Sequence, residues 1–294
     1  ILQRLGALVV PSAVLAELRL KKTKHLLIIP DGSLHYLPFA MLRIAAEDGS
    51  ATRYLLEEFS VSYTPAMTTL ETIRKQRIAR EQSRKVARHP LLAFANPAYG
   101  AEGVVSVPAK ASGDAMITRL RSVRGDYYSG SGLRLTSLPE TEQEAMRVAS
   151  LFGPPTCVRA EAAAEADATA LVLASRAASE DQVKRLLGPR TNRARPGWQY
   201  VLFSTHGLAD PQNGMLSCIA LSAPSGESAE DGFLQAQEVL DLELDADLVM
   251  LSACQTGLGR MRGGEGLVGL CGTFFVAGAE SVCASLWSVP SDPT

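Results

Sequence analysis

The stretch Gln199-Tyr-Val-Leu-Phe-Ser-Thr-His-Gly207 decides the fold, because an apolar run of strand length ends there on a histidine and a glycine. A second stretch, Ala246-Asp-Leu-Val-Met-Leu-Ser-Ala-Cys-Gln255, repeats this arrangement with a cysteine at its end. Strands buried on both faces of a parallel sheet form such near-continuous apolar runs. Functional groups in these sheets lie at the carboxyl ends of the strands. We therefore expect His206 and Cys254 to face one another across a cleft.

These two residues are the minimum equipment for a thiolate nucleophile with an adjacent base. A single cysteine after an apolar strand is usually an inert small hydrophobe, and we interpret Cys218, Cys271 and Cys283 in this way. The joint placement favours chemistry, because Cys254 follows His206 by 48 residues. In caspases the histidine precedes a Gln-Ala-Cys signature by about 50 residues. The run Ala253-Cys254-Gln255 agrees with the core of that signature.

The composition excludes several classes of protein. The 294 residues are 46% hydrophobic, which is enough to bury one large core or two smaller ones. A net charge of −2 without a basic stripe argues against nucleic acid as the direct ligand. No apolar run reaches about 18 residues, so we expect no membrane span. The five cysteines show no metal-ligand spacing, so we expect no metal, no cofactor and reduced thiols in the cytoplasm.

Strands alternate with helices along the chain, which predicts an α/β fold with a mostly parallel sheet. Thr141 and Glu144 have the spacing of a capping box at the start of a helix, as do Ser179 and Gln182. Basic residues up to His89-Pro90 suggest a domain boundary there. The chain also looks like a fragment truncated at its C-terminal end, since residue 1 is Ile and Pro290-Ser-Asp-Pro293 follows an apolar strand. The expected strands are 26–29, 59–63, 91–95, 170–174, 199–205, 246–253 and 282–289, and the expected helices are 68–80, 141–152, 179–188 and 267–277.

At this point the residues resemble a known family, the CHAT domain, a caspase-like peptidase domain found with tetratricopeptide repeats. Six motifs follow one another in the order of that family, and together they cover nearly the whole chain. They are Leu27-Ile-Ile-Pro-Asp-Gly-Ser-Leu-His-Tyr-Leu-Pro-Phe39, Leu138-Pro-Glu-Thr-Glu-Gln-Glu-Ala145, Ser204-Thr-His-Gly207, Leu251-Ser-Ala-Cys-Gln-Thr-Gly257, Gly264-Glu-Gly-Leu267 and Ser285-Leu-Trp-Ser-Val289.

The resemblance implies a caspase/separase-type three-layer fold, with an N-terminal pseudo-protease half (1–88) and an active half (89–294). It implies a cysteine endopeptidase in which His206 is the base and Cys254 the nucleophile. It also implies a protein substrate and control by an activating protein or by upstream tetratricopeptide repeats. The residue preferred before the scissile bond, the substrate and the role of Glu265 stay open.

Thiolate attack on an amide also needs fixed donors for the oxyanion. The backbone N–H groups of Gly207 and Cys254 are the natural candidates, and the sequence assigns no third residue to the His–Cys dyad. Gln255 and Asp292 are candidate residues of the substrate pocket. Capping of a following helix explains Asp292 equally well.

Two other classes of function compete with the peptidase. A caspase-like scaffold that binds proteins without turnover would have the same fold, and a measured His206–Cys254 separation would discriminate the two. A dinucleotide-binding protein would contain Gly-x-Gly-x-x-Gly directly after a strand. Here Gly264-Glu-Gly-Leu-Val-Gly269 follows the expected strand only after ten residues, which argues against nucleotide binding.

Overall fold

The computed structural model describes residues 2–47, 51–83, 87–99, 135–160, 169–189, 196–208, 214–222, 230–252 and 265–285. The chain divides into two compact units, Ile1–Thr72 and Ile73–Thr294. Among the described helices, none is both long and apolar enough to cross a membrane.

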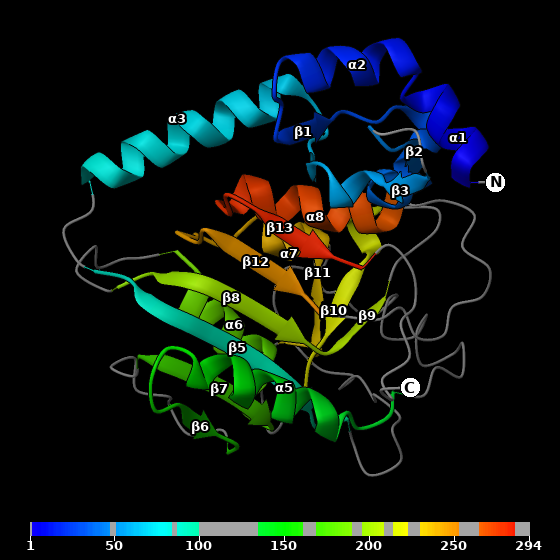
Figure 1. The fold of residues 1–294 in the computed structure, drawn as a ribbon. Coiled ribbons are helices and arrows are strands. Elements are labelled where there is room, and N and C mark those ends of the chain that lie inside the picture. The colour runs from blue at the N-terminus through cyan, green and yellow to red at the C-terminus, as the bar shows by residue number, and fades with distance from the viewer. Residues whose placement is uncertain are drawn as a thin grey trace. The chain divides into compact units, whose positions relative to one another are not determined.

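The first unit combines short helices with two small two-stranded sheets (Figure 1). β1 pairs with β4 in parallel, and β2 pairs with β3 as an antiparallel hairpin. β1 and β4 confirm the strands expected at 26–29 and 59–63. The elements are α1 (Leu2–Val9), α2 (Ser12–Leu20), β1 (His25–Ile28), η1 (Gly32–Tyr36), η2 (Phe39–Met41), β2 (Arg43–Ala45), β3 (Thr52–Tyr54), η3 (Leu55–Glu57), β4 (Ser60–Tyr63) and the start of α3 (Met67–Ser83).

Apolar side chains from these short elements form one cluster in the first unit. A glycine allows α1 to approach β2 closely, because a Cβ on Gly6 would lie 2.1 Å from the carbonyl oxygen of Arg43. The buried members of the cluster are Leu15, Phe39, Leu42, Ile44, Leu55 and Phe59.

The second unit is built on a six-stranded sheet in the order β13-β12-β8-β5-β7-β6. Every pairing in this sheet is parallel, which confirms the predicted α/β class. The two long apolar runs in the sequence are strands, as expected, and the structure shows that these strands, β8 and β12, are neighbours. The strands are β5 (His89–Pro97), β6 (Thr156–Val158), β7 (Ala170–Ser175), β8 (Trp198–Ser204), β12 (Leu248–Leu251) and β13 (Val282–Ala284).

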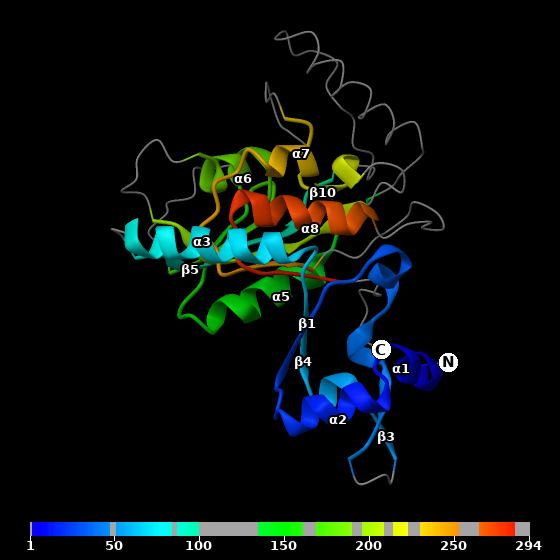
Figure 2. The same cartoon turned by 90° about the horizontal axis from the view of Figure 1, so that it is seen from above.

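Helices cover both faces of this sheet, which gives three layers (Figure 2). α5 (Pro139–Ser150) packs its alanines Ala145 and Ala149 against one face. On the other face lie α6 (Glu180–Leu187), α7 (Ala236–Val239) and α8 (Glu265–Ala277). Successive strand residues alternate between the two clusters, because side chains along a strand point to opposite faces. Thus Leu92 and Phe94 belong to one cluster, and Leu91, Ala93 and Ala95 to the other.

A second, three-stranded antiparallel sheet in the order β11-β10-β9 extends from the end of β8. Its strands are β9 (His206–Leu208), β10 (Cys218–Ala220) and β11 (Phe233–Gln235), with the turn η4 (Gly214–Leu216) before β10. The sequence analysis did not predict this sheet. It matters because its first residue is His206.

The start of α5 differs from the prediction. Its N-cap is Leu138, and the hydroxyl of Thr141 donates to the carbonyl of Leu138 at 2.7 Å instead of capping a later turn. The capping box expected from Thr141 and Glu144 is therefore wrong, because Pro139 occupies the first turn and moves the helix start upstream. The second expected box is half right: the Ser179 hydroxyl accepts from the Gln182 N–H at 3.4 Å.

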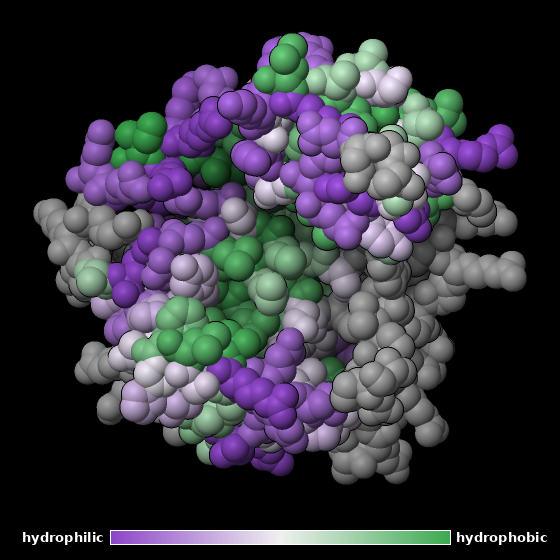
Figure 3. All heavy atoms as spheres, in the orientation of Figure 1, coloured by the Kyte–Doolittle hydropathy of each residue, from purple (hydrophilic) through white to green (hydrophobic). Residues whose placement is uncertain are grey.

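On the α5 side, the β12–β13 edge of the sheet keeps apolar side chains at the surface. Met250 is 37% exposed and its partner in the register, Cys283, is exposed as well. Figure 3 shows apolar side chains gathered on the face of the molecule where this part of the sheet lies.

Candidate active site

The carboxyl edge of the six-stranded sheet brings together the residues that precede both members of the expected dyad. Phe203 of β8 and Leu251 of β12 are direct partners in the parallel register. Neighbouring strands are about 4.8 Å apart. The next residues, Ser204 at the end of β8 and Ser252 directly after β12, therefore lie side by side.

His206 follows Ser204 after a single residue and turns into the second sheet. Its backbone pairs with Ala220 as the first residue of β9, and its side chain is buried with 3% of its surface exposed. Gly207, the next residue, pairs with Ile219 and is also buried. The structure thus places His206 at the expected edge, at the start of a new strand rather than at the loose end of β8.

The ring of His206 has a backbone partner that orients it. Nε2 lies 2.8 Å from the carbonyl oxygen of Thr136. A carbonyl accepts and cannot donate, so this contact requires the proton of a neutral imidazole to sit on Nε2. The lone pair of the neutral ring is then on Nδ1, which makes Nδ1 the basic atom.

The surroundings keep this imidazole neutral. Burial lowers the pKa of His206 below its ordinary value, while the hydrogen bond to Thr136 and the charge of Glu140 partly oppose that shift. The ring of Tyr99 lies 5.4 Å away, measured between centroids, and its hydroxyl donates to the carbonyl of Ala220 at 3.2 Å. Burial raises the pKa of Tyr99, so the neighbouring hydroxyl stays protonated.

Asn96, at the end of β5, holds the segment that contains Thr136. Its Oδ1 accepts from the Ser137 hydroxyl at 2.9 Å and from the Leu138 N–H at 3.0 Å. Its backbone has a φ of +42°, a left-handed conformation that asparagine tolerates better than most residues. Its own N–H donates to the Thr141 hydroxyl at 3.0 Å. These contacts anchor the chain directly after the carbonyl that His206 uses.

Glu144 of α5 meets both strand ends. Its carboxylate accepts a short hydrogen bond from the hydroxyl of Ser204, and the hydroxyl of Ser252 lies 3.3 Å from each carboxylate oxygen. Ser204 is fully buried, whereas Glu144 and Ser252 are half-buried.

The structure does not describe several of the other residues that the sequence predicts for the site. Cys254, Gln255 and Asp292 lie outside the described residues, so the His206–Cys254 separation stays a prediction. Glu265 is the first residue of α8, and its side chain is likewise outside the description.

Three of the four described cysteines are buried or half-buried, as structural thiols usually are, and the fourth, Cys283, is exposed. Cys218 is fully buried, and burial raises the pKa of Cys271 to about 12, so its thiol is protonated at neutral pH. Burial also raises the pKa of the half-buried Cys157. Cys283 is exposed and is therefore the thiol to control for in any labelling experiment.

A cluster of three carboxylates is the one group in the described part of the chain whose ligand atoms lie within 4.8 Å of one another. Glu180, Glu230 and Glu238 form it, and the ammonium of Lys184 lies 2.6, 2.5 and 3.0 Å from their respective oxygens. The lysine supplies the cation that such a cluster requires. Burial, followed by the charge of Glu238, raises the pKa of Glu180. We interpret the cluster as a structural ion-pair network.

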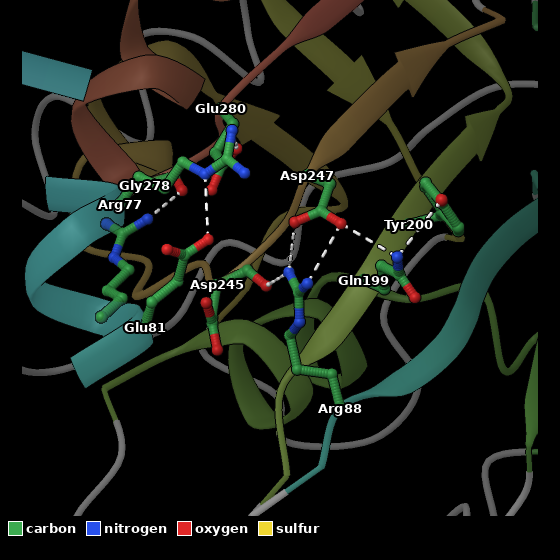
Figure 4. Close-up of polar contacts among 10 residues, drawn as sticks. Arg77, Glu81, Arg88, Gln199, Tyr200, Asp245, Asp247, Gly278 and Glu280 are labelled. Carbon is green, nitrogen blue, oxygen red and sulfur yellow. Dashed lines mark hydrogen bonds and ion pairs between the residues drawn. The ribbon is translucent and has the colours of Figure 1, made fainter. Parts of the chain in front are cut away.

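A second polar network lies at the opposite edge of the sheet, where β5, β8 and β12 begin (Figure 4). Arg88 binds both carboxylate oxygens of Asp247 and donates to the carbonyl of Asp245 at 3.0 Å. Gln199 donates to the same Asp247 carboxylate at 2.9 Å. Arg77 of α3 lies 3.6 Å from Glu280. This network holds strand starts together, far along the strands from His206.

Comparisons with known proteins agree with this fold. The CHAT domain family model matches residues 1–294. Tetratricopeptide repeat protein 28 of Mus musculus is 26% identical over 279 residues, which cover 91% of this chain and 10% of the mouse protein. Tetratricopeptide repeat protein 28 of Homo sapiens is 23% identical over 284 residues, with the same two coverages of 91% and 10%. The chain thus spans about a tenth of the length of these curated relatives. It belongs to the CHAT domain family.

Proposed function

We propose that this chain is a cysteine endopeptidase domain in which His206 is the base and Cys254 the nucleophile. The observation that carries the proposal is the environment of His206: a buried, neutral imidazole at the carboxyl edge of a parallel sheet, with Nε2 bound to the Thr136 carbonyl. A histidine that only fills space in a core does not need a fixed tautomer at the edge where functional groups gather.

The chain geometry supports Cys254 as the partner. Ser204 and Ser252 follow directly paired residues, and His206 and Cys254 each come two residues later. Of the four described cysteines, only Cys283 is exposed, and its strand β13 is not a neighbour of β8.

The reaction would proceed by acyl transfer. Nδ1 of the neutral His206 takes the proton of the Cys254 thiol, and the resulting thiolate attacks the carbonyl carbon of the substrate while the electron pair of the C=O bond moves onto oxygen. As the C=O bond re-forms, the C–N bond breaks and the proton on Nδ1 passes to the leaving amine. Water attacks the thioester with His206 as the base, which releases the acid and restores the thiolate.

The Thr136 carbonyl would stabilise the protonated form of the His206 ring. When Nδ1 takes up a proton the ring becomes cationic, and the hydrogen bond from Nε2 to Thr136 becomes charge-assisted and stronger. To the His206–Cys254 dyad, the Thr136 carbonyl would add a third contributor through the backbone. We assign the oxyanion to the N–H groups of Gly207 and Cys254, and the substrate pocket to Gln255 and Asp292.

We further propose that the substrate is a protein and that upstream tetratricopeptide repeats or an activating protein control access to the site. The support is the family and the printed names of the relatives, which are tetratricopeptide repeat proteins.

The test is labelling with a library of thiol-reactive peptide probes that vary in the side chain before the warhead. Wild type, Cys254→Ala and His206→Ala are compared on a Cys283→Ala background, which removes the exposed competitor. Selective labelling that is lost in both variants supports the peptidase and reads out its pocket. A labelling rate that depends neither on the peptide sequence of the probe nor on His206 supports a scaffold without turnover.

A further inference from the structure

We propose that Glu144 is a positioning residue that sets the spacing between the strand ends leading to His206 and Cys254. The inference rests on the proposed function, and it concerns a carboxylate that the sequence alone had assigned to a helix cap.

Three elements from distant parts of the chain meet at this carboxylate. Glu144 comes from α5, Ser204 is the last residue of β8, and Ser252 follows the last residue of β12. The serines are 60 and 108 residues away from Glu144 in sequence. Both hydroxyls point to the same carboxylate, so Glu144 joins two strands that the sheet itself already pairs.

The chemistry of the contact favours a rigid link. A carboxylate accepts stronger and shorter hydrogen bonds than a neutral oxygen does. One of the two donors, Ser204, is fully buried, so its hydroxyl has little access to water as an alternative partner. A buried hydroxyl without a partner is unfavourable, which keeps Ser204 turned towards Glu144.

The position of the link gives it a consequence for the reaction. Each serine lies two residues before a member of the dyad, so a change in the spacing of Ser204 and Ser252 is passed on to His206 and Cys254. A misplacement of about 1 Å in reacting groups can lower a rate about a hundredfold. Glu144 itself touches no reacting atom in this account.

Helix packing alone does not require this residue. The contact of α5 with the sheet is made by Ala145 and Ala149, both fully buried, with Met146, Val148 and Phe152 packed around them. Glu144 lies beside that apolar contact and directs its carboxylate to the strand ends instead.

The test measures the kinetics of inactivation of the full chain by the best peptide probe from the library, on the Cys283→Ala background. Five variants are compared with the background: Glu144→Gln, Glu144→Ala, Ser204→Ala, Ser252→Ala and the double variant Glu144→Gln/Ser204→Ala. Glu81→Gln is the matched control, because it removes an exposed helix carboxylate that pairs with Arg77. Thermal unfolding is recorded for every variant.

The proposal expects Glu144→Gln and Glu144→Ala to lower the maximal inactivation rate by about ten- to a hundredfold, with little change in probe affinity. The serine variants should each lower that rate, and Ser204→Ala should add nothing once Glu144 is replaced, since residues of one network are not additive. Glu81→Gln should react at the background rate.

Three results would overturn the inference. The first is an unchanged maximal rate in Glu144→Gln while the background protein is labelled at Cys254. The second is a fall in thermal stability with no fall in rate, which indicates a purely structural carboxylate. The third is additivity of Glu144→Gln and Ser204→Ala. If the Glu144 variants do not fold, the serine variants decide alone. Absence of Cys254-dependent labelling in the background protein refutes the proposed function, and this inference with it.

Discussion

Nε2 of His206 lies 2.8 Å from the carbonyl oxygen of Thr136, a residue 70 positions earlier in the chain. This contact fixes the tautomer and turns the ring. It makes the segment 135–138 part of the site through a backbone carbonyl. Two properties can therefore be tested: how Asn96 holds this segment, and whether the His206 ring is neutral.

Asn96→Gly should loosen the segment that carries Thr136. Glycine adopts the positive φ of this position without strain, so the variant removes the side-chain amide, which also donates to Glu142 at 3.2 Å, and leaves the backbone conformation in place. The loss of its bonds to Ser137 and Leu138 should cost about 1–3 kcal/mol of unfolding free energy. Labelling of Cys254 by the peptide probe should slow as well. Urea denaturation and probe kinetics measure the two effects, and an unchanged labelling rate would show that Thr136 holds its place without Asn96.

The buried imidazole makes stability depend on pH. Burial lowers the pKa of His206 in the folded chain, so below about pH 6.5 the unfolded chain binds more protons at this residue. The contribution is complete above the unfolded pKa and is lost as the pH falls below it.

His206→Gln should therefore lose less stability than wild type between pH 7.5 and about pH 5.5. Urea midpoints at the two pH values test this expectation. Equal pH dependence in wild type and His206→Gln would contradict the burial of a neutral ring.

Gly272 inside α8 and Gly278 directly after it should respond to alanine in opposite directions. Gly278 has a φ of +117°, and a Cβ there would lie 2.4 Å from the carbonyl oxygen of Leu244. Gly278→Ala should therefore destabilise the fold by about 1–3 kcal/mol. Gly272 lies inside the helix with no atom within 4 Å of an added Cβ, so Gly272→Ala should stabilise by about 0.5–1 kcal/mol. Thermal unfolding of the two variants measures both effects. A change in stability of the same sign in both variants would contradict the backbone conformation described for these glycines.

The ion pair at the starts of the strands should affect stability without affecting chemistry. Arg88→Ala removes two bonds to Asp247, whose side chain is 32% exposed, so we expect a loss of about 1–2 kcal/mol after allowance for solvent. Arg88→Lys should restore only part of it, because lysine cannot bind both oxygens in the same way. Chemical denaturation measures the loss, and probe labelling of Cys254 well below the unfolding midpoint should match wild type.

The central sheet was predictable because its strands are buried on both faces. The runs expected at 91–95, 170–174 and 199–205 are β5, β7 and β8, with ends that agree within two residues. Their side chains alternate between the α5 cluster and the α6–α8 cluster, so apolar residues line both faces of the sheet. A strand with a polar face would have left a weaker signal.

The short elements were not predictable from local pattern. β9, β10 and β11 have three residues each, too few to show a period, and they form a sheet only because β9 continues from β8. The capping box at Thr141 failed for a related reason. Its residue types suit a helix start, but both side chains bind partners elsewhere in the fold. The Thr141 hydroxyl accepts from the Asn96 N–H, and the Glu144 carboxylate accepts from the serines at the strand ends.

The site was half predictable. His206 is at the expected edge, because a polar residue after a doubly buried strand has few other places to go. The Thr136 carbonyl had no signal in the sequence, since any residue type carries a carbonyl. Asn96 offered one: an asparagine before Pro97 at the end of a buried strand is a residue type that accepts a left-handed backbone.

The measurement that tests the His206–Cys254 pair most directly is the rate of Cys254 alkylation by iodoacetamide as a function of pH, followed by mass spectrometry of the Cys254 peptide. It needs neither a substrate nor an activator. A neighbouring imidazole favours the thiolate, so wild type should react with an inflection below the ordinary thiol pKa of about 8.5. In His206→Ala the inflection should return to about 8.5 and the rate at neutral pH should fall about tenfold. Identical profiles in the two proteins would show that the histidine does not act on this cysteine, and would contradict the proposed peptidase.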